Sequence, residues 1–497
     1  MRRADVIVIG AGPAGCAAAI VLAEAGHDVL LVDRPAGARR ALAESIPPSA
    51  NRLLVELGTD RAVAAAGFQP WTGNTVWWAG APPRVETFAP EARGYQVERA
   101  RFDSVLRDVA TGAGAQLLTG AVRDVTVPGL DNFSETEPSI TVDAGGRIAE
   151  LSAPWVLDCS GRAGMIARKG LRVPEPSHRT VALAGVWRAE TTWPPAQEGH
   201  TLVASHADGW AWSVPVASGL RYVTVMVDPE RSHLTRGASA LTVYRAELDK
   251  VAPFAAWLAQ ARLEDGPWGA DASLYGARQH AGPGFLLAGD AATFIDPLSS
   301  FGVKKALASG WLAGVVAHTL LTAPEMQDAA LAFFETRERA IAASFRQQAA
   351  RYAEDAGVGH PFWQARASEF AGPEGPASED PSILARDPDV RAALHDLQAR
   401  PAIDLRIGDH ARIEPRPVIR GRTLVLEDHL CLPAWPGGLR YIRNIDLVLV
   451  MRLAEAHRDV GDLYEAVVRV QPGVSLPDFL GVLATLLARG GLKHAKM

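Results

Sequence analysis

Gly10-Ala11-Gly12-Pro13-Ala14-Gly15 follows the apolar, β-branched residues Val6-Ile7-Val8-Ile9 of a strand expected at residues 5–9, and it opens an alanine-rich segment at residues 13–25. A second apolar run, at residues 29–32, ends on Asp33. The order of strand, glycine-rich turn, helix and strand is the fingerprint of a βαβ unit that binds a dinucleotide. Its glycines allow a tight turn and let a pyrophosphate approach the free N–H groups of the helix start. The stretch therefore predicts a Rossmann-like α/β domain.

Each residue of this unit has an expected role. The residues that we expect to contact the pyrophosphate are Gly10, Gly12, Pro13, Ala14 and Gly15. Asp33 lies 18 residues beyond Gly15, where an acidic residue meets the ribose hydroxyls, and Arg34 follows it. Arg40 either pairs with the pyrophosphate or faces water. The alternative for Asp33 is an acidic residue that only ends a strand.

A second block runs from Gly289 to Val303 and leads into an apolar helix expected at residues 301–321. The two motifs lie about 280 residues apart, and in this order they predict FAD bound along one domain. Asp290 is expected to hydrogen-bond the ribityl chain. The helix near Gly302 would direct its positive end at the flavin, where the dipole favours the reduced anion. The cofactor-contacting residues expected in this block are Gly289, Asp290, Pro297, Gly302 and Val303.

Patterns along the chain divide it into three parts. We predict a FAD domain over residues 1–350, into which an antiparallel substrate sheet is inserted near residues 66–96 and 166–274. Residues 351–400 read as a connector. Residues 401–497 suggest a β-ribbon at 417–434 and three helices, an α+β module like a winged helix. Its last helix, over residues 476–489, has Ser475 as N-cap.

Composition excludes several classes of protein. The net charge is −6, and residues 401–497 hold 13 Lys and Arg against 11 Asp and Glu, so no basic field for nucleic acid exists. The three cysteines are far apart, which fits a cytoplasmic protein without disulfides or a metal site. Residues 306–324 carry no formal charge, but they follow the flavin motif directly. We therefore expect a buried helix there and no membrane span.

Reducing equivalents must come from elsewhere in the system. A second glycine fingerprint behind a strand is missing from the sequence, so a separate nicotinamide domain is not expected. Two electron donors stay open: NAD(P)H that docks transiently, or a partner flavin reductase.

At these residues the chain resembles the flavin-dependent monooxygenase superfamily, in its tryptophan-halogenase-like branch. Besides the two glycine motifs, the matches are Glu44-Ser45-Ile46-Pro47-Pro48, Asp158-Cys159-Ser160-Gly161 and Trp210-Ala211-Trp212-Ser213-Val214-Pro215. The last is similar to the Trp-x-Trp-x-Ile-Pro signature of halogenases, and the resemblance covers about residues 1–330. It implies a strap beginning at Glu44, cofactor contacts from Ser45, Arg99 and Ser160, and a substrate pocket that includes Trp210, Trp212, Ser299 and Phe301.

Departures from that family favour hydroxylation over halogenation. Halogenases need a lysine in their N-terminal third to relay hypohalous acid, whereas the first lysine here is Lys169. Ser299 stands where tryptophan halogenases place a glutamate, and Phe301 replaces a small residue that helps to hold chloride. The resemblance then implies an oxidoreductase that transfers oxygen from a C4a-hydroperoxyflavin to an electron-rich aromatic ring. Candidates for catalysis are Glu44, which could instead be structural, and Lys304, which with Lys305 could instead face solvent.

The added C-terminal module is similar to a narrower group, the flavoproteins that dihydroxylate a peptidyl tryptophan during quinone-cofactor maturation. A protein substrate needs a docking surface, and strand addition to the ribbon at 417–434 is one physical route. The alternatives are a halogenase of an indole or pyrrole, a saturase of prenyl chains, and a non-catalytic, FAD-stabilised scaffold that carries a peptide.

Overall fold

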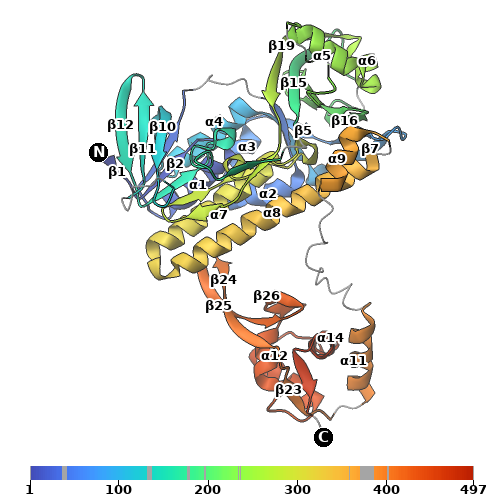
Figure 1. The fold of residues 1–497 in the computed structure, drawn as a ribbon. Helices are drawn as coiled ribbons and strands as arrows, with labels where there is room; N and C mark the ends of the chain where they lie inside the picture. The colour runs from blue at the N-terminus through green and yellow to red at the C-terminus, as the bar shows by residue number, and fades with distance from the viewer. Residues whose placement is uncertain are drawn as a thin grey trace. The chain divides into compact units, whose positions relative to one another are not determined.

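The computed structural model describes residues 2–35, 42–130, 137–175, 179–194, 197–232, 234, 237–356, 359–369, 386–399 and 402–495. Arg40 therefore lies outside the described residues. Internal contacts divide the chain into two compact units, Met1–Pro373 and Glu374–Met497, which are described separately (Figure 1).

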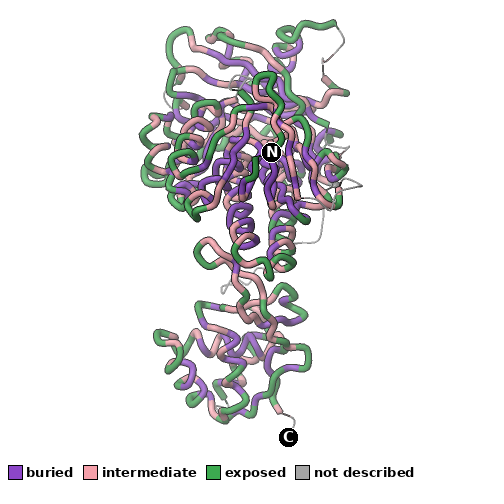
Figure 2. Tube along the Cα trace, turned by 90° about the vertical axis from the view of Figure 1, so that its left-hand side faces the viewer, coloured by how far each residue is buried: buried purple, intermediate pink, exposed green. Residues whose placement is uncertain are grey.

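The first unit is built on a six-stranded sheet with the order β21-β22-β13-β2-β3-β9. Its strands are β2 (Val6–Ile9), β3 (Val29–Asp33), β9 (Gln116–Thr119), β13 (Trp155–Asp158), β21 (Ala281–Gly282) and β22 (Phe285–Leu287). All neighbours run parallel except β21 and β22. The β2 residues are buried throughout, as Figure 2 shows for the interior of this unit. The predicted Rossmann-like α/β fold is confirmed.

Three helices pack near this sheet: α1 (Pro13–Glu24), α4 (Arg99–Gly112) and α7 (Gly302–Thr322) (Figure 1). Helices α1 and α7 approach closely because α7 carries Gly310 and Gly314 at the contact. A Cβ atom on Gly310 would lie 2.0 Å from the carbonyl oxygen of Ala14. Among the described helices, none combines the length and apolar character needed to cross a membrane. The close contact between α1 and α7 brings the two glycine motifs together although they are far apart in the sequence.

A mixed seven-stranded sheet with the order β19-β15-β18-β17-β16-β6-β7 forms the inserted part. The strands are β6 (Gly73–Trp77), β7 (Arg84–Thr87), β15 (Val181–Ala189), β16 (His200–His206), β17 (Gly209–Pro215), β18 (Leu220–Val227) and β19 (Ala261–Asp271). The sheet draws on the two predicted segments, but β6 pairs with β16 in parallel. The other neighbouring pairs are antiparallel, as expected, and the β6–β16 pair is the exception because β6 comes from a different part of the chain. Helices α5 (Ala240–Asp249) and α6 (Ala252–Leu258) share its core, through Tyr244 and Phe254.

Smaller elements complete the first unit. Strands β4 (Ala43–Ile46), β8 (Gly94–Glu98) and β5 (Gln69–Trp71) form one sheet, and helices α2 (Asn51–Glu56) and α3 (Asp60–Ala65) lie between β4 and β5 in the chain. Strands β1 (Arg2–Arg3), β12 (Arg147–Ser152), β11 (Ser139–Ala144) and β10 (Ala121–Thr126) form another. Strands β14 (Arg172–Pro174) and β20 (Tyr275–Ala277) pair separately. Strand β4 carries the segment that begins at Glu44.

The segment predicted as a connector, residues 351–400, is divided between the two units. Helix α8 (Gln327–Ala356) crosses position 350, and α9 (Pro361–Glu369) belongs to the first unit and shares one of its hydrophobic clusters. Trp363 on α9 is buried, and its Nε1 donates to the carbonyl oxygen of His206 at 2.8 Å. The glutamate, aspartate and proline content suggested a linker, but two buried aromatic residues, Phe362 and Trp363, anchor this stretch.

The second unit is an α+β domain with its own core. It contains α11 (Pro388–Ala399), α12 (Leu447–Ala454), α13 (Val460–Val470), α14 (Leu476–Ala488), and strands β23 (Leu405–Ile407), β24 (Arg412–Arg420), β25 (Thr423–Leu432), β26 (Trp435–Leu439), β27 (Tyr441–Ile442), β28 (Ile445–Asp446) and β29 (Leu492–His494). Leu430, Trp435, Leu463 and Phe479 belong to one buried cluster. The side chain of Ser475 accepts from the Asp478 N–H at 3.2 Å, as its predicted N-cap role requires.

The free edge of the β24–β25 ribbon is poorly suited to strand addition. The two strands close on the pair Arg420 and Thr423, with two residues in the turn. Because ladder bonds alternate along an antiparallel pair, Pro415 and Pro417 occupy positions whose backbone nitrogens face away from β25. Proline has no N–H to offer an added strand, and it is typical of protected edges. The expected strand-addition route is therefore not supported at this edge.

Candidate functional site

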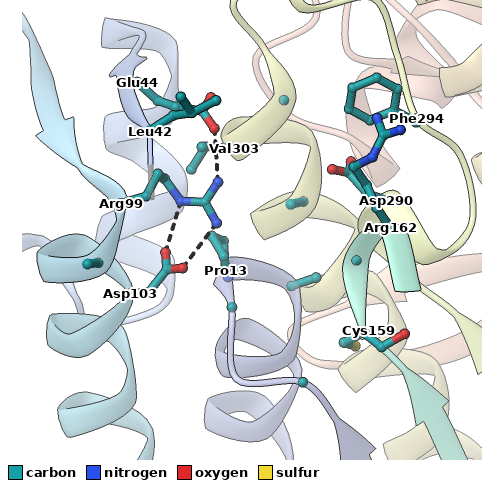
Figure 3. Close-up of a pocket in the computed structure, with 18 of the residues that line it drawn as sticks. Pro13, Leu42, Glu44, Arg99, Asp103, Cys159, Arg162, Asp290, Phe294 and Val303 are labelled. Atoms are coloured by element: carbon teal, nitrogen blue, oxygen red, sulfur yellow. Dashed lines mark hydrogen bonds and ion pairs between the residues drawn. The ribbon is translucent and has the colours of Figure 1, made fainter. Parts of the chain in front are cut away.

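A cavity of about 690 Å³ lies at the carboxyl ends of the parallel strands in the first unit. This is where ligands bind in open α/β sheets. Its lining comes from the turns after β2, β3, β13 and β22, from strand β4 and from the first turns of α1, α4 and α7 (Figure 3). The predicted residues that line it are Gly10, Gly12, Pro13, Ala14, Asp33, Arg34, Glu44, Ser45, Arg99, Ser160, Trp212, Asp290, Pro297, Gly302 and Val303.

Six other predicted residues are not among those that line the cavity: Gly15, Trp210, Gly289, Ser299, Phe301 and Lys304. Two of them shape it from behind. A Cβ atom on Gly15 would lie 1.8 Å from the Gly10 carbonyl oxygen, so Gly15 permits the tight turn. Gly289 has a φ of 64° and is buried. Ser300, which follows Ser299, lines the cavity in its place.

The cavity meets two helix N-termini that lack side-chain caps. Helix α1 begins behind Gly12, and helix α7 begins behind Phe301, and neither cap residue makes a side-chain hydrogen bond. A Cβ atom on Gly12 or Gly302 would meet nothing within 4 Å, so both positions open to space. Uncapped N–H groups at a helix start bind anions. These two ends fit a pyrophosphate at α1 and a flavin ring at α7.

An acid–base pair lines the cavity at the end of β3. Asp33, at the end of β3, lies 3.9 Å from Arg107 of α4, measured between Oδ2 and Nη1. Both residues line the cavity, with Leu117 and Thr119 of β9. Arg107 was not predicted, although it lies on the helix that begins at Arg99, two turns further along.

Arg99 is clamped between two carboxylates. Its Nη1 donates to Oε1 of Glu44 at 2.9 Å, and its Nε and Nη2 donate to the two oxygens of Asp103 at 3.0 and 3.1 Å (Figure 3). Burial raises the pKa of Glu44, and the Arg99 guanidinium opposes that rise. Asp103 was missed by sequence reasoning, although its position four residues after Arg99 on a helix was a usable signal. The clamp fixes strand β4 to the start of α4.

Ser45 and Ser160 are held by buried partners. The Oγ of Ser45 donates to the Gln96 side chain at 2.7 Å. The Oγ of Ser160 donates to Asp158 at 2.6 Å, and Asp158, which is fully buried, also accepts from the backbone of Ile166. Asp158 thereby sets the turn that places Ser160 at the cavity.

An aromatic wall closes another side of the cavity. Trp212 lines it beside Phe294 and Met226. The Arg162 guanidinium lies 4.2 Å from the centre of the Phe294 ring and 3.4 Å from Asp271. Figure 3 shows Arg162 and Phe294 together on the side of the cavity opposite Arg99. Arg162 and Phe294 were not predicted, although each lies within or next to a motif that was.

The two lysines at the start of α7 differ in environment. Lys304 is partly exposed and donates to the Ser49 hydroxyl at 2.9 Å. Lys305 is buried, with its Nζ inside the turn formed by residues 289–293. The expectation that Lys305 faces solvent is therefore wrong, because the turn supplies acceptors that sequence spacing alone does not show.

The comparisons with known proteins agree with this site. The FAD binding domain family matches residues 3–312. Tryptophan 2-halogenase of Chondromyces crocatus is 29% identical over 336 residues, which is 66% of this chain and 64% of that protein. Sulochrin halogenase of Aspergillus terreus is 27% identical, over 62% of each chain. The chain thus matches somewhat less than two thirds of the length of these curated relatives.

Solved structures extend the likeness to nearly the whole chain. The peptidyl tryptophan dihydroxylase QhpG, essential for tryptophylquinone cofactor biogenesis, is 26% identical with a TM-score of 0.69, over 98% of this chain and 99% of that one. The halogenase CmlS has a TM-score of 0.76 at 24% identity, over 100% and 96%, and shows the shared fold. By its family match and its cavity, this chain belongs to the FAD-binding domain family, within the flavin-dependent halogenase-like superfamily, and its cofactor is FAD.

Proposed function

We propose that this protein is an FAD-dependent monooxygenase that hydroxylates an electron-rich aromatic ring, and that its substrate is a tryptophan within a peptide or protein during quinone-cofactor maturation. The observation that carries the proposal is the cavity lining, which contains no lysine among the described residues. Halogenases of the resembling branch need an amine between flavin and substrate to relay hypohalous acid. Lys304 is bonded to Ser49, and Lys305 is enclosed by the residue 289–293 turn.

The reaction balances with an external reductant. FAD, when bound and reduced, supplies two electrons to O2 and activates it for transfer. One oxygen atom enters the ring as a hydroxyl in place of hydrogen, and the other leaves as water. The reductant, NAD(P)H or a partner flavin reductase, restores the two electrons.

The protein's own residues bind and orient the reactants. Gly12 and Gly302 leave space at the two helix starts where the cofactor's anionic and ring portions fit. Trp212 and Phe294 offer flat apolar surfaces to an aromatic substrate. Holding the ring close to the activated oxygen supplies much of the rate, and a water-poor cavity limits loss of the oxidant.

Glu44 is the residue that we propose for proton transfer. It lines the cavity, where burial raises the pKa of its carboxyl group and the Arg99 guanidinium opposes that rise. A carboxyl group with a perturbed pKa beside a substrate cavity is a candidate for general acid–base catalysis. Arg99 holds its carboxylate at 2.9 Å. Lys304, the other initial candidate, is not among the lining residues, so we assign it no step.

The likeness to the peptidyl tryptophan dihydroxylase supports a protein substrate. It extends over both units of this chain. We propose that the second unit, Glu374–Met497, docks that protein, since free tryptophan needs no separate domain.

The test is oxygenation in the absence of halide. The holoenzyme is supplied with a flavin reductase, NADH, O2 and a tryptophan-containing peptide in halide-free buffer, and the products are analysed by mass spectrometry. The proposal expects the peptide to gain the mass of one or two oxygen atoms. Complete conversion of the reductant to hydrogen peroxide, with the peptide unchanged, would refute it.

The names of the curated relatives favour a second candidate, halogenation of an indole or pyrrole. Those relatives are halogenases. The same assay decides between the two when chloride or bromide is added. A product whose mass depends on the halide supports the halogenase and excludes the hydroxylase.

A further inference from the structure

Lys305 occupies a position that is unfavourable for a cation on two grounds. It lies in the first turn of α7, where the helix dipole repels positive charge. It is also only 4% exposed, and an ammonium group removed from water is costly unless it is paired and hydrogen-bonded. Its neighbour Lys304 has the same place relative to the dipole but reaches solvent. A buried lysine here therefore requires specific compensation.

That compensation comes from one turn. The Nζ of Lys305 donates to the carbonyl oxygens of Gly289, at 3.2 Å, and Thr293, and to Oδ1 of Asp290 at 3.3 Å. An ammonium group has three N–H donors, so these three acceptors match its capacity. Asp290 is the charged member of the three, and it also lines the cavity. Lys305 thus connects the helix interior to the carboxylate that the cofactor meets.

The turn is held from other sides as well. The Gly289 N–H donates to the Ser309 hydroxyl at 2.9 Å, and the Tyr275 hydroxyl donates to the carbonyl oxygen of Asp290 at 2.7 Å. Glu338 is buried behind Ser309 and hydrogen-bonds it, and burial raises the pKa of Glu338. The charge of Lys305 acts against that rise, so Glu338 is a second carboxyl group that could compensate the lysine. Only Asp290 is both hydrogen-bonded to Lys305 and part of the cavity lining.

We propose that Lys305 is a positioning residue for the flavin, which fixes the Asp290 carboxylate at the cavity and offsets its negative charge when FAD is reduced. Reduction adds negative charge to the flavin. A carboxylate in the same cavity opposes that change unless a nearby cation balances it. Removing Lys305 should therefore make bound FAD harder to reduce. This inference rests on FAD binding and is independent of whether the protein hydroxylates or halogenates.

The experiment is a double-mutant cycle on the reduction potential of bound FAD, with FAD affinity as a second readout. The variants are Lys305→Met, Asp290→Asn and the combination, all measured in the same buffer at the same pH. Lys305→Met should shift the equilibrium between oxidised and reduced flavin about tenfold toward the oxidised form, about 30 mV for a two-electron couple. It should also weaken FAD binding.

The double variant is decisive, because it removes both charges. Its equilibrium constant between oxidised and reduced flavin should lie within about twofold of the Asp290→Asn value. If the two single effects simply add, Lys305 does not act through Asp290 and the proposal fails. If Glu338→Gln rescues Lys305→Met and Asp290→Asn does not, the lysine serves the buried glutamate instead, which also overturns it.

Controls separate this charge effect from packing. Lys304→Met removes a cation one residue away that faces solvent, and it should leave the potential of bound FAD nearly unchanged. A change equal to that of Lys305→Met would show that overall charge, and not the buried pair, is responsible. If Lys305→Met does not fold, Lys305→Gln closes the cycle, since it keeps a donor but loses the charge.

Discussion

The indole rings of Trp210 and Trp212 stack with their centres 4.8 Å apart and their planes at 29°. Two residues apart on β17, they share one face of the sheet. Trp212 lines the cavity, whereas Trp210 is buried behind it in a cluster with Trp363. In the Trp210–Pro215 motif, Trp212 thus contacts the cavity and Trp210 supports Trp212 from behind.

The two tryptophans should therefore respond differently to substitution. Trp212→Leu is expected to raise the KM for an aromatic substrate about tenfold, with FAD affinity unchanged, because a flat contact surface is lost. Trp210→Ala should lower the free energy of unfolding by about 3–5 kcal/mol, measured by urea denaturation. A Trp210→Ala protein of undiminished stability would contradict this division.

Gly12 and Gly15 provide a second matched pair. Gly12→Ala should fold normally, because its Cβ enters open space, but should weaken FAD binding by about tenfold or more since the pyrophosphate needs that space. Gly15→Ala should destabilise the apoprotein by at least about 2–3 kcal/mol, because its Cβ would meet the Gly10 carbonyl. FAD titration and thermal unfolding of the apoproteins distinguish the two. Equal FAD affinity of Gly12→Ala and the parent chain would place the pyrophosphate elsewhere.

The hydrogen-bonded pair of Arg99 and Glu44 leads us to expect that turnover depends on pH. If Glu44 takes the proton, kcat/KM rises with pH as its carboxyl ionises. Arg99→Met removes the cation that opposes the burial-raised pKa of Glu44, so the acidic limb of the profile should move to higher pH. Glu44→Gln should abolish the limb. An unchanged limb in Glu44→Gln would assign the proton transfer to another group.

Glu335 does not line the cavity, and its lowered pKa predicts that the stability of the folded chain depends on pH. Burial disfavours its ionised form, but hydrogen bonds from His280 and Arg339 outweigh this and lower its pKa from 4.5 to about 2. Because the pKa is lower in the folded chain, the stabilisation is complete above pH 4.5 and is lost as the pH falls toward 2.

A Glu335→Gln variant should accordingly be less stable at neutral pH, by roughly 3 kcal/mol at most. The difference from the parent chain should shrink as the pH falls below 4.5. Urea denaturation at several pH values tests this. A difference that is constant across this range would show that packing, and not ionisation, is responsible.

The second unit should fold by itself, since its core draws on its own residues. Trp435 is its single tryptophan and is 6% exposed. An isolated fragment of residues 374–497 should show one cooperative unfolding transition, in which the Trp435 fluorescence shifts to the red. Gradual fluorescence change without a transition would indicate that the fragment needs the first unit.

The sequence was sufficient to predict those elements whose backbone conformation depends only on neighbouring residues. Helix α14 begins after Ser475 and ends within one residue of the expected position, because a cap hydrogen bond needs only neighbours. The Gly10–Gly15 turn, Asp33 and the residue 289–303 block were likewise predictable, and most of their residues line one cavity.

Features that depend on distant segments were not predictable in this way. Three examples are the parallel pairing of β6 with β16, the hydrogen bond from Trp363 to His206 and the burial of Lys305. Each brings together residues that are not neighbours in the sequence. Sequence alone therefore determined the cofactor fold, because glycine geometry and helix caps are local. Only the tertiary structure decided which charges are buried and which side chains reach the cavity, because burial depends on what the rest of the chain brings alongside.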